Sequence, residues 1–145
     1  MVNVYTEIII CRPIEQVASY AANPDHAPDW YINIDSASWL TEKKIEKGSL
    51  IAFTAQFLGR ELAYTYEIIE YIPENKLIMR TADGPFPMET TYNWIALDEN
   101  NTKMTLRNKG NPSGFSSILA PFMSILMKRA NNKDLRKIKK IIESK

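Results

Sequence analysis

The sequence has very few of the residues that build covalent cross-links and metal centres. Its 145 residues include one cysteine, Cys11, and one histidine, His26. One cysteine excludes an internal disulfide and fits a reducing compartment. No apolar run approaches the roughly 20 residues of a membrane-spanning helix, and the N-terminus shows no basic leader before a long apolar stretch. We therefore expect a cytoplasmic protein without a signal peptide or stable membrane insertion.

Charge of one sign is concentrated only at the C-terminus. Residues 128–145 hold 8 Lys/Arg and 2 Asp/Glu, whereas the preceding 127 residues hold 10 and 15. A basic tail can indicate nucleic acid or an anionic membrane as partner. Here the lysines alternate with apolar Leu135, Ile138 and Ile142, and no aromatic residue stands among them to stack on bases. We interpret the tail as the end of a helix, whose dipole favours cations there, and expect no nucleic-acid partner.

Alternating apolar residues dominate the first three quarters of the chain. Together with turn residues they predict seven strands, at residues 2–10, 32–42, 49–58, 61–72, 76–83, 86–97 and 103–109. Pro13 is placed to open a helix with an apolar stripe that includes Val17 and Ala21. Pro24 and Pro28 then leave room for a single helical turn at most. The predicted order is strand, two short helices, and six consecutive strands.

The last part of the chain has helical periodicity instead. A helix over residues 121–142 would be roughly 33 Å long, and a shorter helix at residues 114–119 can precede it. Apolar residues recur in the long helix at three- and four-residue intervals: Phe122, Met123, Leu126, Met127, Ala130, Ile138, Ile141 and Ile142. We predict an α+β domain spanning residues 1–145, in which a curved seven-stranded antiparallel sheet wraps around this helix. A ligand would occupy the gap between them.

The sequence resembles the bacterial polyketide cyclase/dehydrase-like family of the START/birch-pollen-allergen superfamily, the helix-grip or SRPBCC proteins. The similarity covers the whole chain. It depends on the segments RPIEQVASYAANPDHAPDW, YEIIEYIPENKLIMR, TKMTLRNKG and LAPFMSILMKRANNKDLRKIKKIIE, and on Gly48. These motifs concern architecture and include no catalytic signature. The resemblance implies a helix-grip fold and binding of hydrophobic small molecules, lipid transport, or cyclisation and dehydration of polyketides.

The stretch around His26 is a candidate metal or catalytic site, because Asp25 and Asp29 flank the histidine. A metal site usually needs three or four ligands that include further His or Cys, and a catalytic triad needs a nucleophile within reach. The sequence supplies neither at a suitable spacing. We interpret the aspartates as turn and cap residues, on a short helix that forms a rim of the ligand site with Trp30 turned inward. We predict no metal and no tightly bound cofactor.

Aromatic and methionine side chains are the candidate ligand-binding residues. Tyr64 and Tyr66 share one face of their strand, and Met88, Tyr92 and Trp94 share one face of theirs. Such residues are more often packed core than a ligand site, but tyrosine and tryptophan place polar groups on an apolar wall and methionine tolerates loosely filled space. The predicted lining is Trp30, Tyr64, Tyr66, Met79, Met88, Tyr92, Trp94, Phe115, Leu119, Met123 and Met127. A bulge would invert such assignments.

Charged residues on the strands are predicted to face solvent. By alternation with Tyr66, Met88 and Leu106, this holds for Glu67, Glu89 and Arg107. An inward Arg107 would instead anchor a carboxylate or enolate of a ligand. General acid–base chemistry needs a carboxylate or histidine inside the site, and the pattern places none there, so no catalytic residue is assigned.

Three functions fit these features. The first is binding, or transport, of a hydrophobic or amphipathic small molecule such as a lipid, polyketide or aromatic compound. The second is an aromatase/cyclase or dehydratase that acts in the same cavity, and inward ionisable groups would favour it. The third is a protein-interaction module of the chaperone-activator type, which would expose an apolar patch. A cavity below about 100 Å³ would argue against ligand binding, since pockets usually measure 300–1,000 Å³. A homodimer through exposed strand surface stays open, although no feature points to it.

Overall fold

The computed structural model describes residues 2–57, 59–111 and 122–145. Strand β1 (Val2–Ile10) leads to helix α1 (Ile14–Ala22), the 3-10 turn η1 (Pro24–His26) and the single-turn helix α2 (Ala27–Trp30). The next six elements are the strands β2 (Ile34–Trp39), β3 (Leu50–Phe57), β4 (Arg60–Ile72), β5 (Lys76–Asp83), β6 (Met88–Asp98) and β7 (Asn101–Gly110). Helix α3 (Met123–Glu143) follows.

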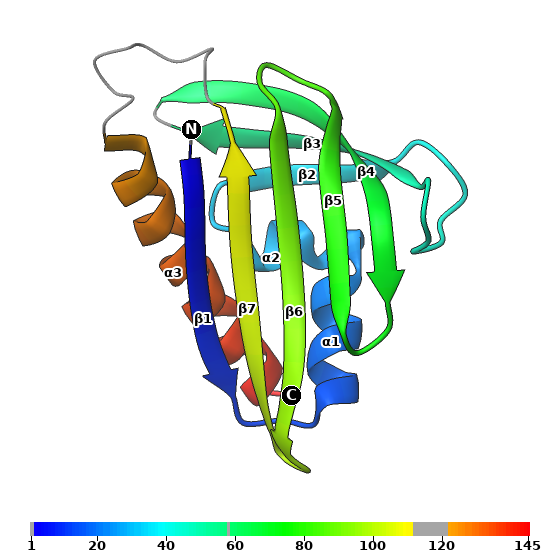
Figure 1. Cartoon of the computed structure of the whole chain (residues 1–145), viewed down its shortest axis with the longest axis vertical. Coiled ribbons are helices and arrows are strands. Elements are labelled where there is room, and N and C mark those ends of the chain that lie inside the picture. The colour runs from blue at the N-terminus through cyan, green and yellow to red at the C-terminus, as the bar shows by residue number, and fades with distance from the viewer. Residues whose placement is uncertain (1, 58, 112–121) are drawn as a thin grey trace.

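The strands form one antiparallel sheet in the order β1-β7-β6-β5-β4-β3-β2 (Figure 1). Each strand from β2 to β6 pairs with the next one along the chain. Strand β1 pairs with β7, so that Val2 faces Gly110 and Ile10 faces Thr102. The strands β1 and β2 are therefore the two edges of the sheet, and α1 and α2 connect them. The predicted α+β helix-grip fold is confirmed.

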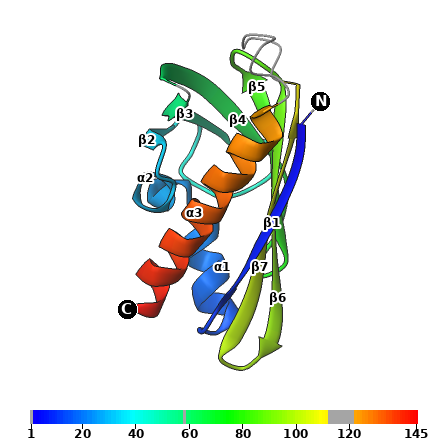
Figure 2. The ribbon, with the colours of Figure 1, turned by 90° about the vertical axis from the view of Figure 1, so that its left-hand side faces the viewer.

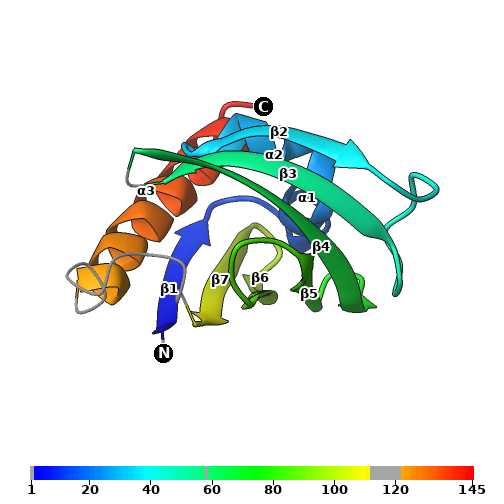
Figure 3. The same ribbon diagram turned by 90° about the horizontal axis from the view of Figure 1, so that it is seen from above.

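The sheet is strongly curved at β4. Its pairing with β5 shifts register between Thr65 and Tyr66 and again between Ile68 and Glu70. Such bulges bend a strand and increase its twist. Seen from above, β3 and β2 swing across the helices while β1, β7 and β6 lie below them (Figure 3). The bend gives the sheet a concave face.

All three helices lie on the concave side, and α3 crosses it diagonally (Figure 2). The side of α3 that meets the sheet buries Met123, Met127, Leu135, Ile138 and Ile142. Complete burial of one such side chain contributes roughly 1.5–3 kcal/mol. The last turn is also anchored to the connection after β1, since Glu143 Oε2 accepts a hydrogen bond of 2.7 Å from the Cys11 backbone amide. Hydrophobic packing along the helix and this anchor fix its position on the sheet.

Some predicted boundaries differ from the structure. Strand β2 begins at Ile34, because the Tyr31 amide still donates to Ala27 O in the last turn of α2. Phe122 is 55% exposed, so the buried stripe of α3 starts at Met123. Pro121 and the predicted helix at residues 114–119 lie outside the described residues. Within the described ranges, no helix has both the length and the hydropathy needed to cross a membrane.

Candidate functional site

A cavity of about 160 Å³ lies between the concave face of the sheet and α3. The buried hydrophobic residues around it form two clusters, a larger one with Trp30, Tyr66 and Tyr92 and a smaller one with Leu62 and Met123. Residues from both clusters line the cavity, and so do Pro24 and Ala27 of the short helices. The cavity therefore separates two packed regions.

Seven of the predicted ligand-binding residues meet at this cavity. They are Tyr64 and Tyr66 of β4, Met79 of β5, Met88 and Tyr92 of β6, and Met123 and Met127 of α3. The alternation along β4 and β6 therefore predicted the inward face correctly for these side chains. Their role in ligand binding stays a prediction.

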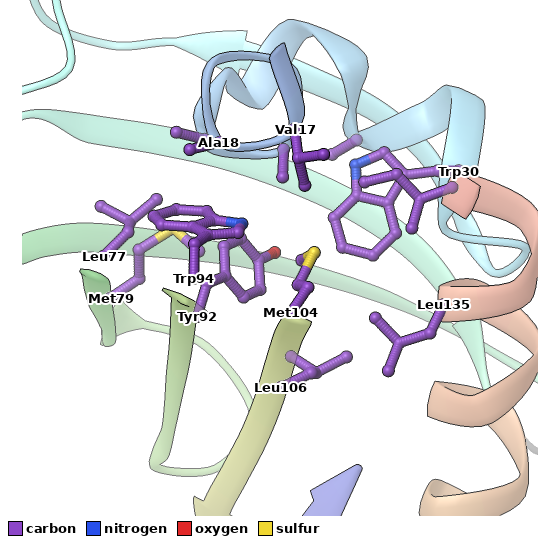
Figure 4. Packing of buried hydrophobic residues seen from close by; sticks show 14 of the residues in the cluster. Val17, Ala18, Trp30, Leu77, Met79, Tyr92, Trp94, Met104, Leu106 and Leu135 are labelled. Atoms are coloured by element: carbon purple, nitrogen blue, oxygen red, sulfur yellow. The ribbon is translucent and has the colours of Figure 1, made fainter. Parts of the chain in front are cut away.

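Trp30 and Trp94 do not line the cavity. They are 0% and 2% exposed and pack inside the larger cluster, where Figure 4 shows both indoles among Leu77, Met104 and the other core side chains. Trp94 shares a face with Tyr92 but lies further along β6, where α1 covers the sheet. Trp30 does turn inward, as predicted, but its ring fills core space. Phe115 and Leu119 lie outside the described residues.

The floor of the cavity carries a chain of hydroxyl groups. Tyr66 Oη lies 2.9 Å from Thr90 Oγ1, which donates to Asn108 Oδ1 at 2.8 Å. Because these side chains are buried, the bonds satisfy polar atoms that would otherwise be costly to desolvate. Burial raises the pKa of Tyr66 to about 12, although the bond to Thr90 opposes this. The tyrosine is a neutral donor at physiological pH.

A pair of tyrosines lies at the α2 side of the cavity. The hydroxyl groups of Tyr31, just after α2, and Tyr92 are 2.5 Å apart. Burial raises the pKa of both, and for Tyr31 the neighbouring Tyr92 and Asp134 raise it further. Two neutral hydroxyls that share one hydrogen bond leave lone pairs for a ligand donor.

The cavity also contains a carboxylate, which the sequence pattern did not place there. Asp134 of α3 is 3% exposed, and among the described lining residues it is the sole acid. Its Oδ1 accepts a hydrogen bond of 2.9 Å from the Ile32 amide, which joins α3 to the start of the sheet edge. Burial raises the pKa of Asp134 to about 6, opposed by the Ile32 amide and by Lys137. A carboxyl group with this pKa can both accept and donate protons near neutral pH.

Asn131 lies one helical turn before Asp134 and also lines the cavity. It is 5% exposed, and its Nδ2 has no hydrogen-bond partner within the described chain. Both residues follow Met127 at the spacing of the buried stripe, at i+4 and i+7. That spacing was the available sequence signal. The predicted stripe included only apolar residues, so it omitted Asn131 and Asp134.

A second hollow, of about 230 Å³, adjoins the cavity between α3 and the segment that leads into β2. The two share Asn33, Phe57, Ala130 and Asp134. Arg129 and Lys133 line the second hollow and both are exposed, so its outer part is cationic. Asp134 thus lies where the apolar cavity meets a groove with a cationic outer part.

The His26 segment is a structured turn, as predicted. His26 Nδ1 lies 2.9 Å from Tyr20 O, and the two rings stack with centroids 4.1 Å apart. Asp25 Oδ1 accepts a hydrogen bond from Trp39 Nε1, and its other oxygen pairs with Lys43 at 2.6 Å. In residues 2–57, 59–111 and 122–145, no three His, Cys, Asp or Glu side chains gather as a metal site would require. The segment supports the rim of the cavity.

The strand charges face outward, as predicted. Arg107 donates to Asn3 Oδ1 at 3.2 Å on the outer face, and its guanidinium lies 5.1 Å from the centre of the Tyr5 ring. Glu89 pairs with Arg80 at 3.1 Å. Arg107 therefore does not anchor a ligand in the cavity.

Solved structures of the same fold come from several organisms. The protein TTHA0849 from Thermus thermophilus is 18% identical, with a TM-score of 0.82, and the match covers 98% of this chain and 97% of that one. The Zhui aromatase/cyclase from Streptomyces sp. R1128 is 15% identical, with a TM-score of 0.82 and coverage of 97% and 93%. A START superfamily protein from Mycobacterium smegmatis is 11% identical, with a TM-score of 0.84 and coverage of 98% and 97%. At these identities the likeness concerns the fold.

No curated protein sequence matches the chain. The family model described as "Polyketide cyclase / dehydrase and lipid transport" matches residues 1–143. The match agrees with the helix-grip fold and with a cavity between sheet and helix. The chain belongs to the polyketide cyclase/dehydrase and lipid transport family.

Proposed function

We propose that the protein binds a hydrophobic or amphipathic small molecule in the cavity between the sheet and α3. The observation that carries this proposal is the cavity itself, with walls of tyrosine, phenylalanine and methionine and a few polar groups. Pockets for small molecules have this composition, with polar groups that orient a ligand held by apolar contact. Family members that bind lipids or cyclise polyketides support the same use of the fold.

The size of the cavity indicates how much of a ligand it can enclose. About 160 Å³ is above the 100 Å³ that would argue against binding but below the usual 300–1,000 Å³. A cavity of roughly 150 Å³ accommodates one benzene ring. We therefore expect one ring, or one segment of a longer chain, to be enclosed, with the remainder in the adjoining groove beside Arg129 and Lys133.

Native mass spectrometry of protein purified from its own host tests the proposal. We expect a co-purified molecule, and we expect the variant Ala55→Phe to lose it, because Ala55 lines the cavity and a phenyl ring would fill most of the space. Ala63→Phe is the matched control, since Ala63 is exposed on the neighbouring strand. Equal ligand content in the two variants would contradict the proposal.

A second candidate function is an aromatase/cyclase or dehydratase acting in this cavity. Asp134 favours it, because a carboxyl group with a pKa of about 6 beside the Tyr31–Tyr92 pair can transfer protons during enolisation and water loss. Here the bound molecule would lose one water on incubation, and Asp134→Asn would prevent the loss. Release of the molecule with unchanged mass would leave binding as the function.

The protein-interaction alternative has less support. Large apolar side chains on the outer face include Ile9 and Ile95, both about half exposed. In the sheet, Lys103 lies between them and pairs with Glu7 at 3.3 Å. A charged pair within the surface interrupts the continuous apolar patch that such a module needs.

A further inference from the structure

Within the described residues, the side-chain amide of Asn131 is a buried donor without a hydrogen-bond partner. The residue is only 5% exposed, it lines the cavity, and Nδ2 finds no partner among the residues that the structure describes. Most buried polar side-chain atoms in native proteins have a hydrogen-bond partner. A buried donor on the wall of a cavity, without such a partner, indicates that the partner is a ligand group with an acceptor atom.

Asp134 supplies the complementary group. Its Oδ1 accepts a hydrogen bond from the Ile32 amide, and Oδ2 is the second acceptor atom of the same carboxylate. Residues at i and i+3 of a helix lie on the same face, with Cβ atoms about 5–6 Å apart. The donor of Asn131 and the acceptor of Asp134 therefore face the same part of the cavity.

We propose, on the basis of the small-molecule binding proposed above, that Asn131 and Asp134 recognise a hydroxyl group of the ligand. Asn131 Nδ2 donates to the hydroxyl oxygen, and the hydroxyl group donates to Asp134 Oδ2. One oxygen atom at roughly 2.9 Å from the amide and 2.7 Å from the carboxylate spans the separation of the two residues. A hydroxyl group is both acceptor and donor at a single atom, which matches this pair.

Other ligand groups fit the pair less well. A ligand carboxylate would accept from Asn131 but would be repelled by Asp134, and an ammonium group would bind Asp134 but offer no acceptor to Asn131. The walls nearby are aromatic, with Tyr64 and Tyr66 ring centres 5.1 Å apart. The ligand class is therefore an alcohol or phenol whose apolar body lies among these rings.

Phenol and toluene are suitable probes because they have the same shape and differ by hydroxyl against methyl. Titrations of the ¹⁵N-labelled protein, followed by NMR, give both dissociation constants and show whether residues of the cavity respond. A purely apolar cavity would prefer toluene, the more hydrophobic molecule. We expect phenol to bind about tenfold tighter, the combined net effect of accepting from Asn131 and donating to Asp134.

Asn131→Leu should reduce that preference severalfold, because it removes one of the two proposed hydrogen bonds. Asn132→Leu changes the adjacent residue, which lies outside the cavity lining, and should keep the preference. The two wild-type titrations test the inference even if Asn131→Leu does not fold. Toluene binding equal to or tighter than phenol in the wild type overturns the hydroxyl assignment and leaves the proposed function standing. If neither probe shifts cavity resonances and no ligand co-purifies, both proposals fail.

Discussion

Asp134 makes the stability of the protein depend on pH in an unusual direction. Burial raises its pKa from 3.8 to about 6, so between these values the folded state binds more protons than the unfolded state. The contribution of Asp134 to the free energy of unfolding is then largest below pH 4 and is lost as the pH rises through 6. A difference of about two between the folded and unfolded pKa of Asp134 corresponds to about 3 kcal/mol in the free energy of unfolding. About 2 kcal/mol of this is lost between pH 4.5 and 7.5.

The neighbours of Asp134 do not change this sign. Tyr31, Tyr64 and Tyr92 face it as neutral phenols with raised pKa values. The cation Lys137 on the same helix lowers the pKa of Asp134, but burial outweighs this effect. Asp134→Asn keeps the shape and an acceptor for the Ile32 amide but cannot ionise. The variant should therefore gain about 2 kcal/mol relative to the wild type as the pH rises from 4.5 to 7.5.

Urea unfolding of both proteins at several pH values measures this difference, and effects of other groups cancel in it. Asp98→Asn is a control of opposite sign, because the Asn100 amide and the Asn101 side chain lower the pKa of Asp98. Its contribution to stability is complete above the unfolded pKa and is lost as the pH falls through the lowered pKa of the folded state. A wild-type minus Asp134→Asn difference that stays constant from pH 4.5 to 7.5 would refute the reasoning.

Three further predictions concern packing and the turn at the cavity rim. Gly110→Ala should lower the free energy of unfolding by about 1–3 kcal/mol, because the added Cβ would lie 2.6 Å from Pro87 O and 2.8 Å from Met88 Sδ; urea unfolding equal to wild type would contradict this contact. Trp30→Ala should lower it by about 3–5 kcal/mol, since the indole is completely buried, and a loss under about 1 kcal/mol would show that the surrounding core is loose. His26→Ala should leave the affinity for the co-purified molecule within a fewfold, because the ring contacts Tyr20 and not the cavity; a protein purified without ligand would give His26 a direct role.

The fold was predictable because its signals are local and repeated. Along β1, buried Val2, Val4 and Ile10 alternate with exposed residues, and the pattern in β6 continues from Thr90 to Trp94. These periods identify strands and their inward faces without any knowledge of pairing. The predicted strands β1 and β5 have the observed bounds, and the start of β2 differs because the turn after α2 continues to Tyr31.

The cavity lining was less predictable, because it depends on where packing stops. Trp94 and Tyr92 have the same alternation, yet only Tyr92 reaches the cavity, and the position of α1 over β6 decides between them. Asn131 and Asp134 were missed for another reason. Polar residues on a buried helical face look like solvent-facing positions unless the stripe is defined by spacing alone, and spacing from Met127 would have included both.

The pairing of β1 with β7 has a consequence for biosynthesis. Thr6 donates its side-chain hydrogen bond to Leu106 O, one hundred positions later in the chain, and β7 is the one strand beside β1 in the described residues. Ribosomes add about 5–20 residues per second, so β1 waits roughly 5–20 s after its own synthesis until β7 is made. During that interval the valines and isoleucines of β1 are exposed on the nascent chain. We therefore expect chaperones to bind β1 until β7 has been made.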